Sequence, residues 1–119
     1  MKPDFDNFFW KLHLSVKHLA TGKGTLKTRL NEVFISYLLH LLVDPGRSEV
    51  ERLISESIQL VTREDDPYGK LGKLYYTLVK NHWRTDREIA EKIFEAYHLA
   101  TESFYENRSI ATDVRSPQP

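Results

Sequence analysis

Hydrophobic residues recur along most of this chain at the spacing of three and four residues that is typical of amphipathic helices. The most apolar stretch is 25–43, TLKTRLNEVFISYLLHLLV. One face of a helix over this stretch would carry Leu26, Leu30, Val33, Phe34, Tyr37, Leu38 and Leu41. Ile35, Leu39 and Leu42 widen that face until little polar surface remains. The pattern predicts a central helix that is covered either by the chain's own other helices or by a second copy.

Four further segments show the same periodicity. They are a first helix capped by Asp4 or Asp6 and ending near Ala20, a third over 48–61, a fourth over 67–81 and a fifth over 85–106. The fourth would bury Leu71, Leu74, Tyr75, Leu78 and Val79, and the fifth Ile89, Ile93, Ala96, Tyr97, Ala100 and Phe104. No long stretch alternates with period two. The sequence therefore predicts an all-α, compact bundle of about five helices in a single domain over 1–106, followed by a flexible tail over 107–119.

Polar residues at the ends of these segments provide the expected start and stop signals. Thr25 is an N-cap candidate after the helix-breaking stretch 22–24, GKG. Ser48 with Glu51, and Thr85 with Glu88, have the spacing of a capping box. Asp66 followed by Pro67 matches an N-cap with proline at the first helical position, which marks the fourth start.

The composition excludes several classes of protein. With no cysteine, the chain can form neither a disulfide scaffold nor a cysteine-ligated metal site. No apolar run approaches the roughly 20 residues that a membrane-spanning helix needs. The beginning of the chain, MKPDFDNFFW, lacks the basic-then-apolar order of an export signal. We therefore expect a cytoplasmic protein with no membrane partner.

Candidate chemistry is sparse. The five histidines do not occur at the spacing of three or four residues that places two metal ligands on one helical face. The stretch 22–25, GKGT, lacks the remaining residues of a phosphate-binding loop. The serines lie in predicted helices without the context of a nucleophile elbow. We expect no cofactor, no metal and no catalytic activity.

Charge is uneven along the chain although its formal net charge is zero. Residues 44–66 include three basic and seven acidic side chains, whereas residues 67–87 include five basic and one acidic. Lys70, Lys73 and Lys80 would lie within about 80° of one another on an ideal helix, opposite its apolar stripe. Such a stripe beside aromatic residues could bind nucleic-acid phosphates and stack on bases. It could equally be an ordinary solvated face whose charge is compensated by the acids of the third helix.

The fourteen aromatic residues exceed what the predicted inner faces need. Surplus aromatic side chains on a small helical domain often mark a protein contact. We therefore predict a protein–protein interaction module, an adaptor, regulator or accessory factor, whose partner is another protein or a second copy in a homodimer. Nucleic-acid binding through residues 70–87 is the alternative. The candidate interaction surface consists of Trp10, Lys70, Lys73, Tyr76, Lys80, Trp83, Arg84 and Arg87.

Overall fold

The fold is a helical bundle, seen here in a computed structural model that describes the backbone of residues 5–64 and 72–115 and the side chains of 7–64 and 72–105. The elements in order are α1 (Phe5–Thr21), α2 (Leu26–Val33), a π-helix η1 (Phe34–Leu38), α3 (Glu49–Val61), α4 (Gly72–Lys80) and α5 (Trp83–Arg115). Within these ranges the chain contains no strand. The predicted all-α bundle of about five helices is confirmed.

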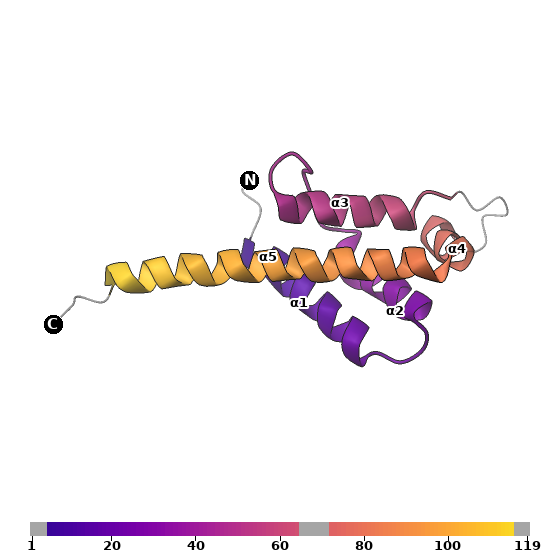
Figure 1. The fold of residues 1–119 in the computed structure, drawn as a ribbon, viewed down its shortest axis with the longest axis horizontal. Helices are drawn as coiled ribbons and strands as arrows, with labels where there is room; N and C mark the ends of the chain where they lie inside the picture. Colours follow the sequence, from indigo (N-terminus) through magenta and orange to yellow (C-terminus); the bar gives the residue numbers. More distant parts are fainter. Residues whose placement is uncertain (1–4, 65–71, 116–119) are drawn as a thin grey trace.

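The long helix α5 runs the length of the molecule, with α3 along one side of it and α1 along the other (Figure 1). The segment formed by α2 and η1 packs against α1 and also contacts α3, α4 and α5. Leu30, Val33, Phe34 and Leu38 in this segment have no exposed surface. The stretch predicted to be central is therefore buried by the other helices along that face.

The loop between α1 and α2 forms where the sequence predicts a break. Gly22 is held so closely under the end of α1 that a Cβ atom there would lie 2.6 Å from the carbonyl oxygen of His18. Gly24 has a φ of +90°, a conformation that side chains with a Cβ rarely adopt. These two positions require glycine, because the chain must reverse direction in four residues to start α2.

Two of the predicted helix starts are confirmed by their hydrogen bonds. The Thr25 hydroxyl accepts from the backbone N–H of Thr28 at 3.2 Å, which caps α2. The Ser48 hydroxyl accepts from the backbone N–H of Glu51 at 3.2 Å, which caps α3. Each satisfies one of the amides that an α-helix leaves free at its first turn.

The predicted start of the fifth helix at Thr85 is wrong, because α5 already begins at Trp83. Thr85 lies in its first turn and donates its backbone N–H to the carbonyl of His82 at 2.9 Å. The imidazole of His82 takes the capping role, since its Nδ1 accepts from the backbone N–H of Arg84 at 3.2 Å. At the other end α5 continues past the expected boundary at Glu106 to Arg115.

The predicted helix over 25–43 is too long. At 34–38 the hydrogen bonds widen to the π pattern, as in the bond of 2.9 Å from the Leu39 N–H to the Phe34 carbonyl. The chain then leaves the helix after Leu38. Phe34 and Leu38, the first and last residues of this wide turn, are both fully buried. Of the second apolar set, Ile35 is 53% exposed and Leu42, beyond the helix, 88% exposed, whereas Leu39 is partly buried against the core.

A further difference from the prediction concerns which side of α4 faces the core. Tyr75 and Val79, predicted to face the core, are exposed, whereas Leu74, Thr77 and Leu78 are buried. The predicted start at Asp66 and Pro67, together with Leu71, lies outside the described residues.

No helix in the described part of the chain is long and apolar enough to cross a membrane.

Candidate interaction surfaces

One lysine side chain of α2 holds the turn from α4 into α5 in place. The Lys27 ammonium, near the start of α2, donates hydrogen bonds of 2.6 Å to the carbonyls of Leu78 and Asn81 and to Oδ2 of Asp86. An ammonium has three donors, so all of them are used here. The first two acceptors close the end of α4, and the third lies in the first turn of α5. Lys27 therefore sets the position of one helix relative to the next.

A second set of bonds ties the same turn to the end of α3. The Arg63 guanidinium donates to Oδ1 of Asn81 at 2.9 Å. The Thr77 hydroxyl accepts from the backbone N–H of Glu64 at 3.0 Å and donates to the carbonyl of Lys73 at 2.7 Å. The backbone of this turn is therefore held by hydrogen bonds from α2 and from the end of α3. The side chains on its outer surface stand on that fixed backbone.

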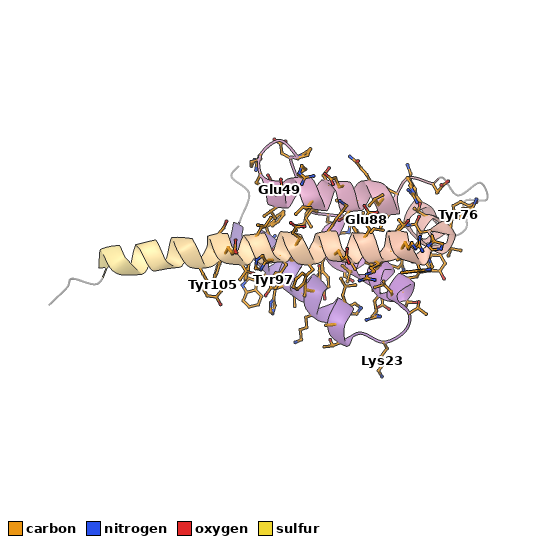
Figure 2. The ribbon with its side chains drawn as sticks, in the orientation of Figure 1. Lys23, Glu49, Tyr76, Glu88, Tyr97 and Tyr105 are labelled. Carbon is orange, nitrogen blue, oxygen red and sulfur yellow. The ribbon has the colours of Figure 1, made fainter. Side chains whose placement is uncertain are left out.

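The outer side of the turn carries basic and aromatic side chains, and we refer to Tyr75, Tyr76, Val79, Lys80, Trp83 and Arg84 as the α4–α5 corner. Tyr76 lies at the end of the molecule where α4 meets α5 (Figure 2). The Lys80 ammonium is 5.0 Å from the centre of the Tyr76 ring. A hydrogen bond with the Tyr76 hydroxyl is the main cause that raises the pKa of Lys80, with a smaller contribution from the Glu64 carboxylate. Lys80 is therefore positively charged at neutral pH.

Trp83 stands in the first turn of α5 with 57% of its surface exposed. Its ring has the Arg84 guanidinium 5.4 Å from its centre and the His82 imidazole 5.5 Å away. Tyr75 and Val79, one helical turn apart on α4, add exposed apolar surface, and Val79 is 52% exposed. Two cation–ring pairs and three large exposed side chains thus fall within ten consecutive residues.

The carboxylates within α3 are paired with cations other than Lys80 and Arg84, whereas Glu64, just after α3, contributes to the raised pKa of Lys80. Glu49 and Glu56 are paired with Arg52 on their own helix, and Glu56 also accepts from Lys92 of α5 at 2.9 Å. Hydrogen bonds from these cations lower the pKa of both carboxyl groups. Glu51 is 3.6 Å from Arg47. The negative charge of this helix is largely matched by its own neighbours.

The structure brings together Tyr76, Lys80, Trp83 and Arg84 from the predicted surface. Lys73 lies on the same side of α4, seven residues before Lys80. Arg87 follows Trp83 by one turn of α5 and forms an ion pair of 3.2 Å with Glu91. Lys70 lies outside the described residues.

Trp10 belongs to a different surface, an aromatic cluster that we define as Phe9, Trp10, His13, Tyr97 and Phe104. Phe9 stacks on Phe104 with ring centres 4.5 Å apart, and Nδ1 of His13 is 2.9 Å from the Tyr97 hydroxyl. The Trp10 ring packs edge-on against His13 and stays 56% exposed. Tyr97 is about 21 Å along α5 from Trp83. The predicted surface is therefore two surfaces.

The residues that support and extend these surfaces were not predicted from the sequence. Tyr75 and Val79 directly follow Leu74 and Leu78, and the apolar spacing does not tell which member of each pair faces the core. No local pattern in the sequence points to Lys27 and Asp86, because their partners lie far away in the sequence. Among the described residues, no three histidine, aspartate or glutamate side chains come together in a way that could hold a metal ion.

A comparison of the chain with protein-family models, with curated proteins and with solved structures found no match in any of the three. Function is therefore inferred from the residues of the α4–α5 corner and of the aromatic cluster.

Proposed function

We propose that this chain is a non-catalytic protein–protein interaction module, an adaptor, regulator or accessory factor that contacts its partner through the α4–α5 corner. The observation that carries this proposal is the exposure of Trp83 and, four positions earlier in the chain, of Val79. Tryptophan and arginine are enriched among the few residues that supply most of the affinity of protein interfaces. In the α4–α5 corner, Trp83 and Arg84 lie side by side.

The way the corner is held supports the same proposal. Binding costs free energy when loops and side chains must be ordered at the interface. Here Lys27 and Arg63 fix the backbone on which Trp83 stands. A partner would meet a surface whose main chain is already in place.

The proposal is tested by site-specific photocrosslinking in cells of the source species. A crosslinking amino acid at position 79 should capture a defined partner, and Trp83→Ala in the same chain should reduce that capture severalfold. Phe94→Ala is the matched control, because Phe94 is an exposed aromatic residue of the same helix, about 16 Å from Trp83 along its axis. Equal loss of capture in both variants, or no loss in either, would contradict the proposal.

Nucleic-acid binding at the same corner is the second candidate function. It is supported by the two cation–ring pairs, Lys80 with Tyr76 and Arg84 with Trp83, because bases stack on such rings while cations meet phosphates. A labelled single-stranded oligonucleotide would then bind with an affinity that falls steeply with salt. A protein contact centred on Trp83 would be far less sensitive to salt.

A second copy of the chain is the other protein partner that we consider. The exposed Ile35 and Leu42 are apolar enough to contribute to a homodimer contact. Light scattering at two concentrations distinguishes a dimer from a monomer. The proposed setting of the interaction is the cytoplasm, which fractionation of cells expressing the tagged chain would test.

A further inference from the structure

We infer that the α4–α5 corner binds a short acidic segment of a partner protein that carries at least one large apolar side chain. This inference rests on the proposed function and specifies the chemistry of the partner. Its carboxylates would meet Lys80 and Arg84, and its apolar side chain would lie against Trp83 and Val79.

The requirement for acidic residues follows from how charges are paired in the chain. Several cations in the described part of the chain form ion pairs, among them Lys27, Arg52 and Lys92. Lys80 and Arg84 form no ion pair with a described residue and instead lie beside aromatic rings. The α3 carboxylates are paired with Arg47, Arg52 and Lys92, and the Glu64 carboxylate acts on Lys80 without forming an ion pair with it.

The requirement for an apolar side chain follows from the exposed apolar residues next to the two cations in the chain. Val79 precedes Lys80 directly, and Trp83 precedes Arg84 directly. Arg84 follows Lys80 by four positions, so their Cα atoms are at most about 14 Å apart. An extended peptide covers that distance in four or five residues. The fitting ligand is therefore a short segment with acids flanking a large apolar residue.

The same observations favour a peptide over a nucleic acid. Proteins that bind duplex or single strands through phosphates use a track of many cations. Here the described basic residues of α4 and of its turn into α5 are Lys73, Lys80 and Arg84, and the charge of Arg87 beyond them is matched by Glu91 at 3.2 Å. The exposed side chain of Val79 can bury against an apolar residue but gains little from a charged backbone.

The test uses the full chain with Trp10→Phe, which leaves Trp83 as the only tryptophan. The probes are a twelve-residue peptide with leucines flanked by glutamates, the same peptide with glutamine or with lysine in place of glutamate, and a twenty-nucleotide single strand of DNA or RNA. The expected result is a saturable blue shift of Trp83 emission with the glutamate peptide, and binding about tenfold weaker with the glutamine peptide.

Variants of the chain locate the contact. Lys80→Gln and Arg84→Gln should each weaken binding of the glutamate peptide about threefold, the effect of one exposed ion pair. Lys17→Gln, a change at an exposed lysine of α1, is the matched control and should leave binding unchanged. Circular dichroism of each variant confirms that the helical content is retained.

Three outcomes would overturn the inference. They are equal affinity for the glutamate and glutamine peptides, no saturable binding of the glutamate peptide up to 1 mM (about −4.1 kcal/mol), and tighter binding of the oligonucleotide than of any peptide. If the peptide result fails while crosslinking at position 79 still depends on Trp83, the proposed function stands and only the acidic chemistry is wrong. If the crosslinking fails as well, both are wrong.

Discussion

Lys27 Nζ lies 2.6 Å from Oδ2 of Asp86, and this contact joins the start of α2 to the first turn of α5. Asp86 is 2% exposed, and its other oxygen, Oδ1, is buried without a hydrogen-bond partner among the described residues. A buried carboxylate is costly unless a cation compensates it. Lys27 is that cation, so the arrangement of helices at this end depends on one ammonium group.

Replacing Lys27 with methionine should lower the free energy of unfolding by about 3 kcal/mol, the lower end of the range for breaking a buried ion pair. The lower end applies because the Lys27 side chain is partly exposed and water can reach it. Urea unfolding followed by circular dichroism measures the change.

Lys23→Met is the control for this substitution. Lys23 is exposed in the loop between α1 and α2, as Figure 2 shows, and its replacement should change stability by less than about 0.5 kcal/mol. In Lys27→Met, a second change of Asp86 to leucine should recover part of the loss, since it removes the unpaired charge. Equal stability of Lys27→Met and the unmodified chain would show that the pair does not hold the helices.

Leu78 and Val79 are neighbours on α4 with opposite surroundings. Leu78→Ala should destabilise the fold by about 2 to 5 kcal/mol, because Leu78 is almost wholly buried. Val79→Ala should cost less than about 1 kcal/mol, because half of Val79 is already in water. Thermal unfolding of the two variants gives the comparison, and similar losses would mean that the described face of α4 is not the buried one.

Phe34 and Ile35 form a similar pair at the start of the π-helix. Phe34→Ala should cost about 3 to 5 kcal/mol and Ile35→Ala less than about 1 kcal/mol. This contrast tests which side of the segment 34–38 faces the core, since a large loss in Ile35→Ala would place that residue inside. Chemical denaturation of both variants decides between these results.

The ion pair between Glu56 and Lys92 should make stability depend on pH in the acid range. A hydrogen bond from Lys92 is the largest cause that lowers the pKa of Glu56, followed by one from Arg52. A lowered pKa contributes stability above the unfolded value of about 4.3, and this contribution is lost as pH falls through the folded value.

The measurement is the urea midpoint of the unmodified chain and of Glu56→Gln. The difference between them should be present at pH 7 and should shrink as pH falls through the lowered pKa of the Glu56 carboxyl group. Glu95→Gln is the control, since Glu95 is exposed on α5 and forms no ion pair with a described residue. A difference that persists unchanged at pH 3 would show that charge is not its cause.

Periodicity in the sequence was enough to predict the helices and most of the core. The positions with no exposure in α5, Ile89, Ile93, Ala96 and Ala100, follow the spacing of one helical face. The caps at Thr25 and Ser48 were found because they bond to residues three positions away. Signals of this kind are local, and the sequence displays them directly.

What depends on contacts between distant residues could not be predicted. The π-turn at 34–38 leaves no mark in an apolar run, because leucine, isoleucine and phenylalanine fit an α-helix equally well. Lys27 and Asp86 are separated by 59 positions, so only the folded chain brings them together. The same reason explains why Trp10 was placed on one surface with Trp83, although Trp10 packs with Phe9 and His13 on α1 and Trp83 lies at the start of α5.

The helix α5 begins at the corner and passes the aromatic cluster as one uninterrupted rod (Figure 1). Trp83 and Tyr105 lie about 33 Å apart along its axis. Two molecules that occupied the two ends at once would be held by this one helix at a set spacing and in a set rotational order. Shortening α5 by two residues between Ile89 and Ala96 would turn one end by about 160° relative to the other and so break that order.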